Sequence, residues 1–213
     1  MSLRRALWKQ ANLGVVNKNQ LCAILLTGGA SRRMGQDKAF LPLGKLPLWA
    51  AVAQQVAPIC SQLFVLHSPE QNLDPTALSL PPGTEVHYVC DPELHQGPLY
   101  ALAQLSARLT LPWSLVLSTD LPFLTADFLA DLLQLSDQGN TMVAQNGGKQ
   151  NPLLALYPTA QLQTAPALWA AGRQDAKALL EGQPVVSIND RPEARGINRI
   201  EGYHSALAEL GKP

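Results

Sequence analysis

The 213-residue sequence predicts an α/β fold in which a mostly parallel sheet carries helices on both faces. Three observations lead to this class. Short apolar runs alternate with segments whose apolar residues recur at helical spacing, the pattern of strands joined by right-handed crossovers. Hydrophobic residues make up 46% of the chain, enough for one sizeable core. Polar or glycine-rich residues directly follow several of the apolar runs. Together these features predict a Rossmann-like sheet.

The N-terminal half contains four predicted strands, each an apolar run bounded by polar or turn-forming residues. In chain order we predict a strand over 21–27, a helix over 46–60, a strand over 63–66, an exposed connection with four prolines over 68–84, a strand over 86–89, a helix through Leu99, Leu102, Leu105 and Leu109, and a strand over 114–118.

The C-terminal half is less regular, because strands and helices no longer alternate strictly. We predict a helix over 127–135, strands over 141–145 and 153–156 around Asn146-Gly147-Gly148, a helix through Leu162 and Leu168, a short helix over 176–180, a strand over 185–188 and a last helix over about 200–210. Residues 21–213 then form one domain, and residues 1–20 a poorly ordered basic arm.

Composition excludes several classes of protein. No apolar run approaches the ~20 residues of a membrane span, and no export signal is visible. The three cysteines, Cys22, Cys60 and Cys90, form no C-x-x-C motif and are expected to be buried free thiols in a reducing cytoplasm. Lysine and arginine together number 16, as do aspartate and glutamate, so nothing predicts a nucleic-acid-binding face.

Residues 25–38, LLTGGASRRMGQDK, are the most informative segment. Glycines let backbone N–H groups approach an anion, while arginine and lysine neutralise phosphate oxygens. The segment contains neither G-x-x-x-x-G-K-[ST] nor G-x-G-x-x-G, so it is neither a P-loop nor a dinucleotide fingerprint. A plain strand-to-helix turn with a solvated basic face is the alternative, but such a turn does not require three cations beside two glycines.

This segment resembles the nucleotidyltransferase signature L-x-G-G-x-S-x-R-M-G-x-D-K, and the full string is similar to that of the molybdenum cofactor guanylyltransferases. The resemblance runs from residue 21 to about residue 207, and it implies a fold like that of the nucleotide-diphospho-sugar transferases. It implies that Leu26, Thr27, Gly28 and Gly29 bind the nucleotide.

Charged residues of the signature are the expected catalytic groups. We expect Lys38 and Arg33 to contact the triphosphate and to act in catalysis, with Arg32 a weaker candidate because adjacent side chains do not easily face one ligand. Asp37 either orients Lys38 or lies on the surface, and the sequence leaves both possibilities open.

Two aspartates follow predicted strands, where α/β sheets bind ligands. Asp120 resembles the family aspartate that holds the metal, and one carboxylate suits Mg²⁺, which takes few protein ligands beside substrate phosphates. The alternative is that Asp120 caps the next helix, for which Thr125 is better placed. Asp91, in D-x-x-x-x-x-G-P-L, resembles the family aspartate that contacts the nucleotide; the alternative is an Asx turn.

Asn151 and Asn198 lie in segments that resemble the family's second-substrate region. Asn151 stands where the family has histidine in H-P-L-x-x-L-Y, and Gly196 stands where it has the first asparagine of N-x-N-T-P-E, of which Asn198 is the second.

The resemblance implies transfer of GMP from GTP to molybdopterin or molybdenum cofactor, with Mg²⁺ as cofactor and pyrophosphate released. Other cofactor-biosynthesis proteins are possible partners, whereas nucleic acid and membranes are not expected. Two alternatives stay open: a cytidylyl- or sugar-phosphate nucleotidyltransferase, and a nucleotide-binding module without turnover.

Overall fold

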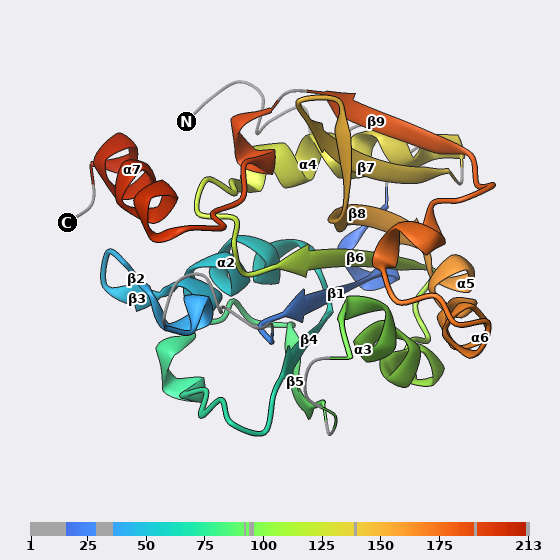
Figure 1. The fold of residues 1–213 in the computed structure, drawn as a ribbon, viewed down its shortest axis with the longest axis horizontal. Helices are drawn as coiled ribbons and strands as arrows, with labels where there is room; N and C mark the ends of the chain where they lie inside the picture. Colours follow the sequence, from blue (N-terminus) through green and yellow to red (C-terminus); the bar gives the residue numbers. More distant parts are fainter. Residues whose placement is uncertain are drawn as a thin grey trace.

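A computed structural model describes residues 16–28, 36–91, 93, 96–138, 140–189 and 191–211. Among them, seven strands form one sheet in the order β5-β4-β1-β6-β8-β7-β9 (Figure 1). The strands are β1 (Leu21–Leu26), β4 (Gln62–His67), β5 (Glu85–Cys90), β6 (Trp113–Ser118), β7 (Thr141–Asn146), β8 (Lys149–Pro158) and β9 (Val185–Asn189). Only β8 runs antiparallel to its neighbours in this sheet, so the predicted mostly parallel α/β fold is confirmed.

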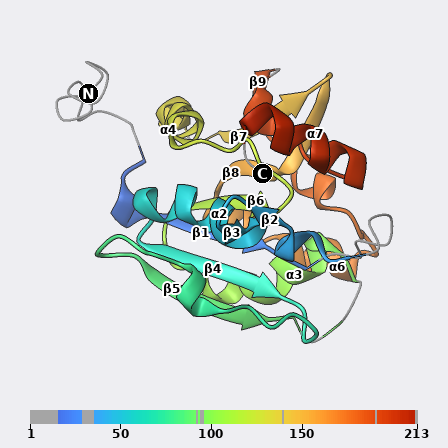
Figure 2. The same ribbon diagram turned by 90° about the vertical axis from the view of Figure 1, so that its left-hand side faces the viewer.

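The helices cover both faces of the sheet (Figures 1 and 2). They are α2 (Leu48–Val56), α3 (Pro98–Leu105), α4 (Ala126–Gln134), α5 (Thr159–Leu162), α6 (Ala165–Ala170) and α7 (Ile200–Leu210). Short 3₁₀ turns are η1 (Lys18–Gln20), η2 (Lys38–Phe40), η3 (Ala57–Ile59), η4 (Pro75–Ala77), η5 (Ser106–Arg108), η6 (Leu135–Gln138), η7 (Ala176–Leu179) and η8 (Pro192–Ala194). No helix in the described part of the chain is long and apolar enough to span a membrane.

Strand β1 divides the core into two layers because successive side chains point to opposite faces. Leu21, Ala23 and Leu25 pack into the layer under α2 and α4, whereas the alternate residues Cys22 and Ile24 pack into the layer under α3. All six residues of β1 are buried, which explains why the strand reads as a continuous apolar run in the sequence.

Local signals account for most element boundaries, and three predicted helices were wrong in detail. The helix predicted over 46–60 begins at Leu48, because Leu46–Pro47 (β3) pairs with Pro42–Leu43 (β2) in an unpredicted hairpin. The helix through Leu162 and Leu168 is two helices; α6 begins anew with Pro166 in its first turn, where a missing N–H costs nothing. Residues 176–179 form a 3₁₀ turn rather than an α-helix.

Burial corrects two further expectations. Cys22 and Cys60 are buried free thiols, and desolvation raises the pKa of Cys60 to about 12, but Cys90 is exposed. The connection over 68–84 is not wholly exposed, because Gln71 and Leu73 are buried within it.

Residues 16–20, which we predicted to belong to a poorly ordered arm, have defined contacts with the rest of the chain. Val16 is 5% exposed, and the carbonyl of Lys18 accepts a hydrogen bond from the Ser61 N–H at 3.0 Å, so residues 16–20 pack against the domain. Residues 1–15 lie outside the described part of the chain.

Candidate functional site

A cleft of about 1180 Å³ opens at the carboxyl ends of the parallel strands. In Figure 1 the arrowheads of β1 and β6 point toward this side of the sheet, on which β2, β3 and α7 also lie. The cleft brings together eight residues that the sequence singled out: Leu26, Thr27, Gly28, Lys38, Asp91, Asp120, Asn151 and Asn198. Gly29, Arg32 and Arg33 lie outside the described residues.

Lys38 and Asp120 face each other across this cleft. The Lys38 ammonium lies 3.4 Å from Asp120 Oδ2, and the two side chains are 22% and 18% exposed. The ammonium also donates to the carbonyl of Ile197 at 3.4 Å. Ser118 Oγ donates to Asp120 Oδ1 at 2.5 Å, so hydrogen bonding fixes the carboxylate from the side opposite the lysine.

Asp120 does not cap the following helix. Thr125 does so, because its Oγ1 accepts a hydrogen bond from the N–H of Phe128 at 3.2 Å, as predicted. The carboxylate of Asp120 is therefore available to the cleft. Among the described residues no group of three or more His, Cys, Asp or Glu side chains gathers, so a cation here would rely on this carboxylate and on ligand oxygens.

The C-terminal segment reaches the same carboxylate from the other side. The N–H of Ile197 donates to the carbonyl of Asp120 at 2.8 Å, and a Cβ built on Gly196 would lie 3.3 Å from Asp120 Oδ2. Only a residue without a side chain allows this close approach undisturbed. Asn198 follows directly and lines the cleft.

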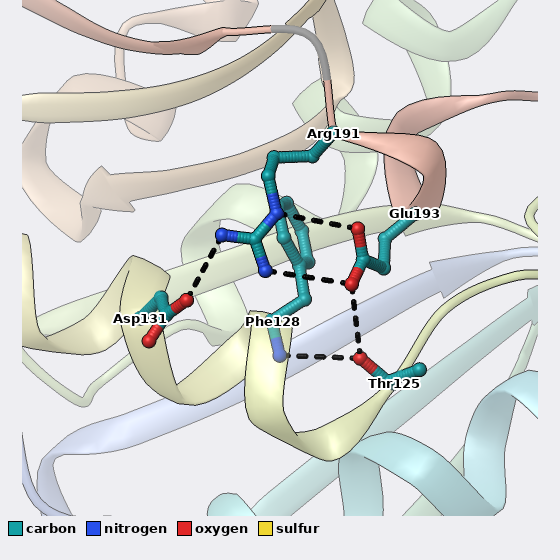
Figure 3. Close-up of polar contacts among 5 residues, drawn as sticks. All are labelled: Thr125, Phe128, Asp131, Arg191 and Glu193. Carbon is teal, nitrogen blue, oxygen red and sulfur yellow. Dashed lines mark hydrogen bonds and ion pairs between the residues drawn. The ribbon is translucent and has the colours of Figure 1, made fainter.

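An arginine anchors this C-terminal segment to α4 (Figure 3). The Arg191 guanidinium pairs with Asp131 at 3.1 Å and with Glu193 at 3.4 Å. Its central carbon lies 5.5 Å from the centroid of the Phe128 ring, and Thr125 Oγ1 donates to Glu193. These contacts hold η8, and with it the strip that carries Gly196 and Asn198, against the helix.

Asp91 forms an Asx turn at the edge of the cleft, and its contact with a nucleotide stays a prediction. Its Oδ1 accepts the N–H of Glu93 at 3.2 Å, the contact of an Asx turn, and its side chain also lines the cleft. Burial is the main cause that raises the pKa of its carboxyl.

Asn151 lies beside an irregularity in the pairing of β7 and β8, between Val143 and Ala144. Its Oδ1 accepts the N–H of Leu153 at 3.0 Å, so this oxygen is engaged within its own strand. Exposed Lys149 and Lys177 line the same side of the cleft and were missed by sequence reasoning, because single lysines in turns carry no signal.

Two hydrogen bonds hold the carboxylate of Asp37. Its Oδ1 accepts the N–H of Ala39 at 2.9 Å, which caps η2, and its Oδ2 accepts from Gln71 Nε2 at 2.7 Å. Gln71 lies in the proline-containing connection and has no sequence motif, so only the fold reveals it.

Comparison with known proteins gives consistent results. Residues 23–196 match the family described as MobA-like NTP transferase domain. The chain is 33% identical over 164 residues to a probable molybdenum cofactor guanylyltransferase of Synechococcus elongatus, covering 74% of this chain and 82% of the relative. It is 31% identical over 198 residues to one of Mycobacterium avium, covering 89% and 96%.

Solved structures show the same fold. Molybdopterin-guanine dinucleotide biosynthesis protein A of Archaeoglobus fulgidus superposes with a TM-score of 0.66 at 18% identity, over 89% of this chain and 98% of that one. The 2-C-methyl-D-erythritol 4-phosphate cytidylyltransferase of Thermus thermophilus gives 0.66 at 19% identity, with the same coverage of 89% and 98%.

Proposed function

The chain belongs to the family of MobA-like NTP transferase domains and is thus a nucleotidyltransferase, and from this premise we propose that it is a molybdenum cofactor guanylyltransferase. It transfers GMP from GTP to molybdopterin or its molybdenum-loaded form and releases pyrophosphate. The observation that carries this proposal is one cleft whose lining brings together Gly28, Lys38 and Asp120 with Asn151 and Asn198.

Phosphoryl chemistry of this kind requires positioning and charge neutralisation more than proton transfer. An oxygen of the acceptor's terminal phosphate attacks the α-phosphorus of GTP, and the bond from that phosphorus to the bridging oxygen breaks. The bonding pair leaves with pyrophosphate. The attacking phosphate is already ionised near neutral pH, so no general base is needed.

The chain's own residues divide this work between them. We assign Lys38, the loop N–H groups of Gly28 and Gly29, and Arg33 to the departing phosphates, because cations and amide dipoles stabilise the charge that develops there. Leu26, Thr27 and Asp91 line the nucleotide side of the cleft, and Asn151 and Asn198 line the acceptor side.

The donor set around Asp120 fits a hard divalent cation. A partly buried carboxylate held by Ser118 stands at a strand end and faces the cleft. We assign Mg²⁺ to this carboxylate; bound there, it would supply a Lewis acid that stabilises charge on phosphate oxygens.

Nucleotide preference is the test that separates the guanylyl proposal from its nearest alternative. Calorimetric titrations with GTP, CTP, ATP and UTP in the presence of Mg²⁺ should give the tightest binding for GTP, with CTP at least about tenfold weaker, or ~1.4 kcal/mol. Equal affinities would contradict the guanylyl assignment. The cytidylyltransferase of similar fold keeps a cytidylyl activity as the second candidate, favoured if CTP binds best.

Turnover separates an enzyme from a module that only binds nucleotide. We expect pyrophosphate to be released from GTP only when molybdopterin or molybdenum cofactor is added. Release with a sugar phosphate instead would assign another acceptor, and GTP binding without release for any acceptor would indicate a binding module. Because GTP is the proposed substrate, we place the protein in the cytoplasm. Other cofactor-biosynthesis proteins are possible partners there.

A further inference from the structure

We propose that Gln71 is a positioning residue that fixes Lys38 relative to the backbone at Gly28. Lys38 and Gly28 both line the cleft. Gln71 hydrogen-bonds the residue that precedes each of them, Asp37 before Lys38 and Thr27 before Gly28. This inference rests on the proposed function for its consequence in catalysis, but its geometry is independent of the nucleotide.

Gln71 is 6% exposed, and each of the four hydrogen-bonding positions of its amide has a partner within hydrogen-bonding distance. Its Nε2 donates to the carbonyl of Thr27 at 3.0 Å and to Asp37 Oδ2 at 2.7 Å. Its Oε1 accepts from Thr27 Oγ1 at 2.9 Å and from the N–H of Ser68 at 3.0 Å. A single buried amide therefore joins three segments of the chain.

The connection to Lys38 passes through Asp37. While Oδ2 of Asp37 accepts from Gln71, its Oδ1 accepts the N–H of Ala39 and so caps the turn in which Lys38 stands. The other amide hydrogen of Gln71 holds Thr27, the neighbour of Gly28. Thr27 and Asp37 lie near the two ends of the glycine-rich segment, residues 25–38. Because Gln71 bonds both of them, it sets the distance between them.

Gln71 is itself held in place by its surroundings. The N–H of Gln71 donates to the carbonyl of Ser68 at 3.1 Å, which closes a turn directly after β4. The Thr27 hydroxyl lies 2.9 Å from the carbonyl of Leu66, near the end of that same strand, as well as 2.9 Å from Gln71 Oε1, so its single hydrogen serves one of these two acceptors at a time. The amide is therefore anchored on the sheet rather than on the segment that it positions, which is what precise placement of a catalytic cation requires.

Glutamate has the same shape as glutamine but neither amide donor, so Gln71→Glu tests the inference directly. It would place a carboxylate against Asp37 and against the carbonyl of Thr27, which breaks both bonds to the ends of the segment. We expect the dissociation constant for GTP with Mg²⁺ to rise at least tenfold, and kcat to fall more than KM for the acceptor rises.

A second substitution provides the rescue that a merely structural role would not give. In Asp37→Asn alone, one side-chain oxygen remains for two donors, the N–H of Ala39 and Nε2 of Gln71. This single variant should therefore weaken GTP binding as well. In the double variant Gln71→Glu/Asp37→Asn, the asparagine amide can donate to the new carboxylate while its oxygen caps Ala39. We expect GTP binding to recover in part relative to Gln71→Glu, because the contact with residue 37 is restored while the new carboxylate still faces the carbonyl of Thr27.

Gln161 offers a matched control, because it too bonds a backbone carbonyl, that of Leu179, and a threonine hydroxyl, that of Thr141, and it does not line the cleft. Gln161→Glu should change GTP binding by less than twofold. If Gln161→Glu and Gln71→Glu weaken GTP binding equally, or if the double variant is no better than Gln71→Glu, the inference fails.

Amide hydrogen exchange without any nucleotide keeps this inference separate from the proposed function. Gln71→Glu, or Asp37→Asn if the first variant does not fold, should speed exchange at the N–H groups of Thr27 and Ala39 at least tenfold and leave β6 unchanged. Unchanged exchange would overturn the inference. Failure of the unsubstituted protein to bind GTP would contradict the proposed function and leave this readout intact.

Discussion

The two sides of the cleft are built differently. On the side that we assign to the nucleotide, Thr27 and Gln71 are buried close to the ends of β1 and β4, and Gln71 donates a hydrogen bond to the half-buried Asp37. On the acceptor side, residues come from the β7–β8 hairpin and from the strip after β9, where the contacts of Arg191 are half-exposed ion pairs. Buried bonds fix geometry more strongly than exposed pairs, so the difference indicates a rigid nucleotide side and an adaptable acceptor side.

Asp120 and Lys38 join these two sides, because the Asp120 carboxylate contacts Lys38 and closely approaches Gly196, while its backbone carbonyl accepts the N–H of Ile197. Substitutions at this junction should therefore have the largest effects, and substitutions on the acceptor side the smallest.

Asp120→Asn should cause the largest loss. The fold should persist, since Asn keeps the shape, but turnover should fall on the order of 100-fold because the negative charge that holds the cation is gone. Steady-state pyrophosphate release, with thermal unfolding as a check of the fold, measures this. Asp127→Asn, an exposed aspartate in the first turn of α4, is the control. Undiminished turnover at ordinary Mg²⁺ would exclude the metal role.

Lys38→Ala should lower kcat more than it raises KM for GTP, by about tenfold to 100-fold, because the ammonium stabilises charge that appears mainly in the transition state. Lys38→Arg should recover activity only in part, since a guanidinium differs in reach and geometry. Steady-state kinetics of these variants measure the effect. The control is Lys45→Ala, which removes an exposed lysine at the tip of the β2–β3 hairpin. A kcat that does not change would leave Arg33 as the remaining candidate.

Gly196→Ala should lower turnover by about tenfold with little loss of stability, because the new Cβ would stand 3.3 Å from Asp120 Oδ2 and displace the carboxylate. Gly202→Ala is the matched control: nothing lies within 4 Å of its Cβ, and α7 should gain ~0.5–1 kcal/mol of stability. Steady-state turnover and thermal unfolding of both variants test this prediction. Equal turnover in the two would show that the close approach of Gly196 to Asp120 is unimportant.

Arg191→Ala should have the smallest effect. Loss of the ion pairs with Asp131 and Glu193 should raise KM for the acceptor ~2–5-fold and leave KM for GTP unchanged, because exposed ion pairs contribute little. Arg173→Ala removes a comparable exposed pair, with Glu181, away from the cleft. If KM for GTP rose as much as that for the acceptor, the two sides of the cleft would not be separable.

Sequence reasoning succeeded wherever a local pattern carried the information. Gly28, Asp91 and Asp120 could be grouped because each follows an apolar run, and parallel strands end at one edge of the sheet. Gln71 could not be identified as a site residue from the sequence, because neither its neighbours in the chain nor its residue type marks it. Lys149 and Lys177 were missed for the same reason.

The sequence by itself determined the class of fold, the seven strands of the main sheet, the last helix and the identity of the glycine-rich segment, because periodicity of side chains and turn chemistry act over short distances along the chain. Only the tertiary structure decided which side chains meet. Lys38 contacts Asp120 from 82 residues away and the carbonyl of Ile197 from 159 residues away. Such contacts depend on how the sheet, the hairpin and the C-terminal strip pack together, and no local pattern specifies that packing.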